Sequence, residues 1–175
     1  MASADKANAA ETAGRQDYSE NVADNETIYL VFDLVGENCG LNVAEVLSIV
    51  LVPPNITRVP NAPYYVRGVM NLRGTIIPVL DCGMKLGGAA AVVAQESRVV
   101  VAEIEGVQFG VMVDAVREVR SVFDAQVEKP DASKSSSLSV DYVSGIAKMD
   151  DGRLLVLLDL AKVFDLEELL EEEIF

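Results

Sequence analysis

An internal duplication constrains this 175-residue chain more than any other feature of its sequence. Shifting the sequence by 70 positions places Gly40 on Gly110 and aligns the alternating apolar residues on either side. Alternation with a period of two is typical of β-strands, and the glycines interrupt it where turns are expected. Segment 29–49 is therefore repeated by segment 99–119, as strand, turn and strand.

A second repeat follows the first at nearly the same spacing. Segment 65–69 resembles segment 142–146 at a shift of 77, and segment 76–81 resembles segment 154–159 at a shift of 78. Since the two blocks recur in the same order, duplication explains the pattern better than a chance likeness between hairpins.

Each repeat unit contains about five short strands, which are too few for a flat sheet with two open edges. We therefore predict that each unit closes into a small barrel. The first unit spans about 27–88 and the second about 96–165. Two barrels sharing one core, with short helices, suit a chain of this length, so the predicted fold class is mainly β.

The chain continues into a predicted C-terminal helix, with Asp159 placed to cap its first turn. The spacing of four residues gives this helix one apolar stripe, which we expect to pack on the barrels: Val163, Leu166, Leu169 and Leu170. Residues 166–175 form the acidic end of this helix.

The net charge of −14 is concentrated near the two ends of the sequence. Residues 1–26 carry six acids and two bases, and we predict that they are disordered. Residues 165–175 carry six acids and no base. The sequence has no stripe of basic residues that could neutralise phosphates, so we do not expect nucleic acid as a partner. With neither a membrane-spanning apolar run nor a secretory signal, we expect a cytoplasmic protein without direct membrane insertion.

Two connectors are also visible in the sequence. Residues 87–95 form the predicted link between the units, and the serine-rich run 133–137 is predicted to be flexible.

The residues that most enzymes need are missing or scattered. The chain has no histidine, which removes the commonest general base and metal ligand, and we expect no cofactor and no catalysis. Cys39 and Cys82 fit no metal or redox pattern and are interpreted as buried reduced thiols.

Three aspartates are candidate site residues. Asp81 and Asp159 occupy equivalent places in the two units, where capping explains them better than paired acid–base chemistry. Asp114 has no acidic counterpart in the other copy, since Ala44 stands there. It could orient backbone amides or an arginine, but a surface or capping role is the favoured interpretation.

The turn containing Asn71, Arg73 and Gly74 is the most informative segment. The second unit has residues 148–152 at this turn, so we infer that the turn geometry does not demand Asn71 or Arg73. An arginine beside a glycine at a strand end can pair with a partner's carboxylate or carbonyl, although a solvated arginine explains the sequence equally well.

Residues 27–165 resemble the CheW family, the coupling proteins of chemotaxis arrays. The resemblance is carried by specific stretches of the chain: 29–32, 56–63, 65–74, 77–81, 110–116 and 157–160. It implies two five-stranded SH3-like barrels and a non-catalytic adaptor. The implied partners are the regulatory domain of a CheA-type histidine kinase and the cytoplasmic hairpin tip of a methyl-accepting chemoreceptor.

The resemblance also implies a set of partner-binding residues. They comprise apolar strand-end positions in both units and the turn just described: Val43, Val46, Ser48, Ile49, Asn71, Arg73, Gly74, Val113 and Val116. The chain departs from the family at two places. Ser48 stands where a glutamate is common, with Glu45 nearby, and Cys82-Gly83 stand where leucine and arginine are usual.

Two other functions stay open at this point. One is a CheW-like adaptor in a chemosensory pathway other than motility, and the second is a small-ligand-binding barrel. The low aromatic content, without tryptophan, disfavours a barrel that stacks nucleotide bases.

Overall fold

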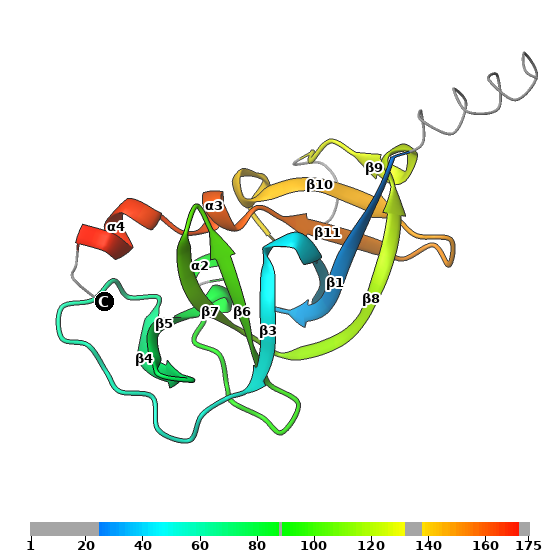
Figure 1. The fold of residues 1–175 in the computed structure, drawn as a ribbon. Helices are drawn as coiled ribbons and strands as arrows, with labels where there is room; N and C mark the ends of the chain where they lie inside the picture. The colour runs from blue at the N-terminus through cyan, green and yellow to red at the C-terminus, as the bar shows by residue number, and fades with distance from the viewer. Residues whose placement is uncertain (1–24, 88, 132–137, 172–175) are drawn as a thin grey trace, which may run out of the picture.

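The computed structural model describes residues 25–87, 89–131 and 138–171 and consists mainly of β-strands (Figure 1). The first unit contains β1 (Glu26–Leu34), β2 (Glu37–Asn42), η1 (Val43–Glu45), β3 (Val46–Leu51), β4 (Val66–Leu72), β5 (Thr75–Asp81) and α2 (Cys82–Gly87). The second contains β6 (Arg98–Ile104), β7 (Val107–Val113), β8 (Ala115–Phe123), η2 (Asp124–Gln126), β9 (Val127–Glu128), η3 (Val140–Tyr142), β10 (Val143–Lys148), β11 (Leu154–Leu158), α3 (Leu160–Val163) and α4 (Leu166–Glu171).

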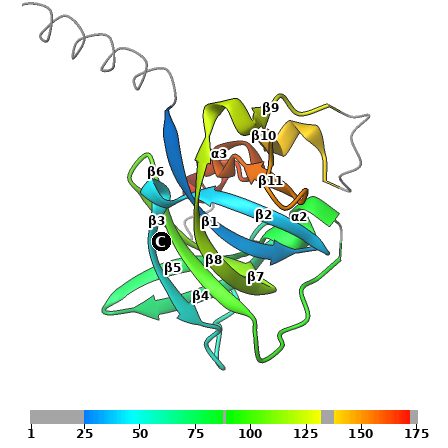
Figure 2. The same cartoon turned by 90° about the vertical axis from the view of Figure 1, so that its right-hand side faces the viewer.

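The strands form two strongly curved sheets that lie side by side (Figure 2). One sheet has five strands in the order β3-β6-β7-β5-β4, and the other has six in the order β8-β1-β2-β11-β10-β9. The sixth strand, β9, is only two residues long. The predicted pair of small barrels is therefore correct in architecture, but each barrel takes strands from both repeat units.

The register of the two parallel pairings follows the repeat. Gly40 pairs with Leu157 where β2 meets β11, and Gly110 pairs with Val79 where β7 meets β5. A Cβ atom on Gly110 would lie 2.5 Å from Val99 Cγ1, so a side chain does not fit there without a shift. Close packing against side chains of the neighbouring strands, Val99 for Gly110 and Leu157 for Gly40, explains why the glycine recurs.

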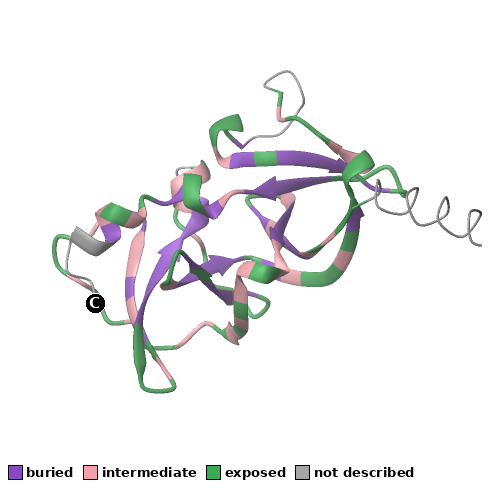
Figure 3. Cartoon of the chain, turned by 45° about the horizontal axis from the view of Figure 1, so that its top comes forward, coloured by how far each residue is buried: buried purple, intermediate pink, exposed green. Residues whose placement is uncertain are grey.

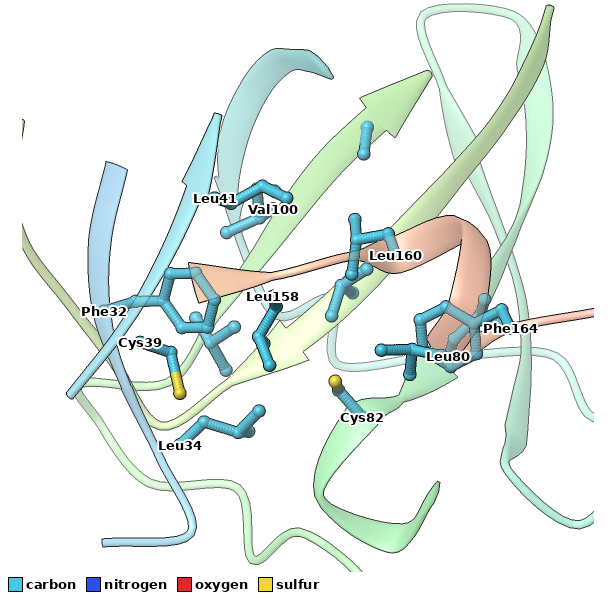
Figure 4. Packing of buried hydrophobic residues seen from close by; sticks show 14 of the residues in the cluster. Phe32, Leu34, Cys39, Leu41, Leu80, Cys82, Val100, Leu158, Leu160 and Phe164 are labelled. Carbon is cyan, nitrogen blue, oxygen red and sulfur yellow. The ribbon is translucent and has the colours of Figure 1, made fainter. Parts of the chain in front are cut away.

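Alternation along the strands divides the buried residues among three clusters. The largest lies between the barrels and takes Phe32 and Leu34 from one sheet and Leu80 and Val100 from the other (Figure 4). The inside of the six-stranded barrel is filled by Val31, Val122, Ala147, Met149, Leu155 and Leu157. The inside of the five-stranded barrel is filled by Met70, Ile77, Val79, Val99, Val101 and Met112. The central strands are buried on both faces, as the purple ribbons of Figure 3 show.

The cysteine prediction is confirmed. Cys39 and Cys82 are free and buried, and both belong to the cluster between the barrels (Figure 4). Burial raises the pKa of the Cys39 thiol to about 12, with smaller contributions from Glu37, Asp33 and Asp114. Burial also raises the pKa of the Cys82 thiol. Both thiols are therefore protonated at neutral pH.

The single C-terminal helix of the prediction is wrong, because two short helices replace it. Phe164 between them has extended backbone angles, and its buried ring anchors the break. The carboxylate of Asp159 caps α3 by accepting from the Ala161 amide, and Asp165 accepts from the Glu168 amide in α4. The expected packing on the barrels holds for three stripe residues: Val163, Leu166 and Leu169. The side chain of Leu170 is not among those described.

Several predictions about tails and connectors fall outside the described residues. These segments are 1–24, 132–137 and 172–175, which include the serine-rich run. Within the predicted N-terminal tail, Glu26 already belongs to β1. Across the described residues, no helix combines the length and the apolar character needed to cross a membrane.

Candidate protein-binding surface

A tight two-residue turn between β4 and β5 carries the predicted arginine. Leu72 and Thr75 form the last strand pair, and Arg73 and Gly74 between them have φ angles of 52° and 89°. The Oδ1 atom of Asn71 accepts a hydrogen bond of 2.9 Å from the Gly74 amide. The Asn71 side chain therefore stabilises this turn. The same left-handed pair forms at Val35-Gly36 and Glu105-Gly106 without an asparagine two residues earlier, so the geometry does not demand Asn71.

Arg73 makes a different contribution, since its side chain is exposed while its backbone is left-handed. That backbone conformation costs a residue other than glycine of the order of 1 kcal/mol. Val35 and Glu105 have the same conformation in the β1–β2 and β6–β7 turns. The turn therefore accommodates various side chains, and its geometry does not select the guanidinium of Arg73.

The strand β3 forms one edge of the five-stranded sheet and alternates between half-buried and exposed side chains. Leu47, Ile49 and Leu51 are 52%, 42% and 69% exposed and form one apolar row. Contact of apolar side chains with water is unfavourable, and a partner that covers them removes it. An exposed apolar row on an edge strand is therefore a feature of binding surfaces. Ile49 was predicted from the sequence, whereas Leu47 and Leu51 were missed, although the alternation in 46–51 contains the signal.

Of the other predicted residues nearby, Val46 and Ser48 lie on the opposite side of this strand, and Val43 lies in η1 just before it. Val46 is half-buried and packs against the cluster between the barrels. Ser48 is also half-buried, next to an irregularity in the pairing of β3 with β6. Val43 is half-buried in η1, whose first turn is capped by the side chain of Asn42.

The two predicted residues in the second unit differ from each other. Val116 is half-buried and packs against the cluster between the barrels. Val113 is only 3% exposed and belongs to that cluster. We therefore withdraw Val113 from the proposed contact surface, because it has almost no area to offer a partner.

Glu45, near the missing family glutamate, lies at the junction of the barrels. Partial burial, and secondarily the nearby Asp159, raise the pKa of its carboxyl group. It follows Ala44 in η1, where the chain passes from the six-stranded sheet to the five-stranded sheet. Its carboxylate therefore stands on a different element from Ser48 and does not replace a side chain at that position.

The three aspartates have structural roles. Asp81 and Asp159 each accept an amide hydrogen bond at the start of a helix, which confirms capping. Asp114 accepts from the Val35 amide at 3.1 Å, so it orients a backbone amide. Among the described residues, no group of three or more acidic or cysteine side chains could hold a metal ion.

These features define a double-barrel scaffold with exposed apolar and cationic groups on one five-stranded sheet. Comparison with known proteins then identifies the family. The family model described as "CheW-like domain" matches residues 29–168, and the chain belongs to this family.

The chain is similar to several named relatives. It is 29% identical over 141 residues to "Chemotaxis protein CheW" of Klebsiella aerogenes, covering 81% of this chain and 83% of that protein. It is 34% identical over 112 residues to "Chemotaxis protein CheW" of Rhizobium meliloti, covering 64% and 71%. The solved scaffolding protein TtCheW from Thermoanaerobacter tengcongensis superposes with a TM-score of 0.71 at 33% identity, covering 81% and 89%.

Proposed function

We propose that this chain is a non-catalytic adaptor that couples chemoreceptors to a CheA-type histidine kinase. The observation that carries the proposal is that one sheet of a CheW-like domain exposes two features that its fold does not require. These are the apolar row on β3 and the guanidinium of Arg73. Two separate binding features are what an adaptor needs, since it acts by holding two proteins together.

The two features have different chemistry and suit different contacts. Full burial of a leucine or isoleucine side chain contributes about 1.5–3 kcal/mol, so the β3 row can supply much of an interface. An arginine can make paired charge-assisted hydrogen bonds to a carboxylate or bind a backbone carbonyl, which fixes orientation. The proposed partners are the kinase regulatory domain and the cytoplasmic tip of the receptor, so the adaptor would work in the cytoplasm.

The arginine is tested by Arg73→Ala in a three-component assembly of the full chain, kinase and receptor fragment. Loss of a charged hydrogen-bonding group costs about 1.5–3 kcal/mol, so assembly should weaken by roughly 10- to 100-fold. Arg153→Ala is the matched control, because Arg153 lies at the equivalent hairpin of the second unit and pairs with Asp151. Equal assembly by both variants and by the natural chain would contradict the role of Arg73.

The apolar row is tested by Ile49→Asp in a binding titration with each partner alone. We expect at least about tenfold weaker binding of one partner, because a carboxylate would be desolvated at the contact. Ile76→Asp is the control, since Ile76 is an exposed aliphatic residue on β5 of the same sheet. If the two variants behave alike, the row has no special role.

A further inference from the structure

A cleft of about 760 Å³ lies between the loop that follows β3 and the connector that follows α2. Its walls expose polar and apolar surface in nearly equal parts, and the apolar part includes Pro53, Ile56 and Tyr64 on one side and Ala90 and Val93 on the other. It begins beside Val66 and Arg67 at the start of β4. Arg73 is six residues further along the hairpin, which is about 20 Å in a strand. The cleft is thus distinct from the turn used in the proposed function.

The connector exposes apolar side chains. Val92 is 85% exposed and Val93 is 50% exposed, and alanines precede and follow them. Across the cleft, Tyr64 is 62% exposed. Removing apolar groups from water lowers the free energy of a protein. Apolar side chains that stay exposed together are therefore typical of a surface that a partner covers.

A buried carboxylate holds the cleft in this shape. Asp81 is fully buried and accepts hydrogen bonds from the Met84 amide in α2 and from the Ala91 amide in the connector, at 3.0 and 2.8 Å. The Nη1 atom of Arg67 lies 3.7 Å from the second carboxylate oxygen. Asp81 thus links three elements that border the cleft, so the open cleft is preorganised rather than a gap left by loose packing.

Comparison of the two repeat units shows that the scaffold does not require these groups. At a shift of 77, Ser144 stands in place of Arg67 and Asp141 in place of Tyr64. Asp159, the counterpart of Asp81, caps α3 through a single amide. The first unit therefore has a tyrosine, an arginine and a second amide contact that the same fold omits in the second unit.

The charge of the lining indicates the kind of partner. Arg58 and Arg67 are the two charged residues among those lining the cleft, although the whole chain has 28 acids and 14 bases. Arg67 pairs with the buried Asp81, so Arg58 is the lining cation that is left for a ligand. An anionic group is therefore favoured at the rim, beside the apolar walls. We infer that this cleft binds an acidic, apolar segment of a partner protein, with apolar side chains between Tyr64 and Val93 and carboxylates at Arg58.

The inference is tested with a random twelve-residue peptide library selected on the full chain. Selected peptides should combine leucine, isoleucine or aromatic residues with Asp or Glu. Their affinity should fall at least about tenfold for Val93→Asp, which places a charge on the apolar wall. Val119→Asp serves as the control, since Val119 is 60% exposed and does not line the cleft. Thermal unfolding of each variant would verify that it folds.

A charge exchange provides the second arm. Arg58→Glu should weaken the selected peptides and strengthen versions in which lysine replaces their acids, whereas Lys162→Glu, outside the cleft, should change neither. Selection of basic peptides, of no peptides, or of peptides insensitive to Val93→Asp would overturn the inference. So would self-association that Val93→Asp abolishes, because a second copy would then be the occupant. Kinase and receptor binding need not change in any of these outcomes.

Discussion

Replacing the buried Asp81 with alanine should destabilise the protein far more than the same change at its repeat counterpart Asp159. Asp81→Ala leaves the Met84 and Ala91 amides without their acceptor and removes the carboxylate beside Arg67. Each buried donor left unsatisfied costs about 1–3 kcal/mol, so we expect a loss of roughly 2–5 kcal/mol. Asp159→Ala removes one exposed capping bond, which costs about 1 kcal/mol.

Urea unfolding followed by circular dichroism would measure both free energies of unfolding. The dependence of the unfolding free energy on urea should be the same for the two variants, because both unfold the same surface. Asp81→Asn provides an intermediate case, since its amide oxygen can still accept from one of the two backbone amides. Equal losses for Asp81→Ala and Asp159→Ala would refute the argument that Asp81 joins α2 to the connector.

Three further predictions concern the turn, the packing at Gly110 and the buried thiols. Arg73→Gly should raise stability by about 1 kcal/mol in the same urea assay while weakening assembly, because glycine relieves the left-handed backbone and removes the guanidinium; an unchanged assembly would contradict this. Gly110→Ala should destabilise by about 1–3 kcal/mol through its clash with Val99, whereas Gly36→Ala meets nothing within 4 Å and should cost only the strain of its φ of +75°. The Cys39 pKa of about 12 exceeds the ordinary value of 9.0. The protonated thiol therefore makes its full contribution to the free energy of unfolding below pH 9. Between pH 9 and about 12 stability should fall by about 1.4 kcal/mol per pH unit from this thiol. Cys39→Ala should lower the slope by that amount, while the contribution of the buried Cys82 thiol remains.

The strands and the repeat could be predicted from the sequence, but the exchange of strands between barrels could not. A period of two shows which residues share a face of a strand and leaves open which strand is its neighbour. Here β5 pairs with β7 and β11 pairs with β2, and each pairing joins different repeat units. The break at Phe164 could not be predicted either. An apolar residue in a helical pattern can also be buried where the backbone is extended, and the pattern does not distinguish the two cases.

Residues of the candidate site could be predicted where both their type and their place in the repeat set them apart from the scaffold. Arg73 stood out because the other unit lacks it, and its exposure agrees with that argument. Val113 was misjudged because its apolar character is equally suited to a core, and only the packing between barrels shows that it is buried. The network around Asp81 was partly predicted, since capping follows from sequence, but contact with Ala91 depends on how the connector folds back.

The duplication offers a way to separate scaffold from function within one chain. Residues that recur at the repeat spacing, such as Gly40 and Gly110, are explained by packing in both copies. Two residues without a counterpart lie on the β4–β5 hairpin, Arg67 near one end and Arg73 at the other. A hairpin fixed by its strand pairs, with β5 paired to β7, can hold two contacts at a constant separation. Two proteins bound as proposed would then be aligned by geometry alone, and any change in kinase output would have to come from contacts that differ between its signalling states.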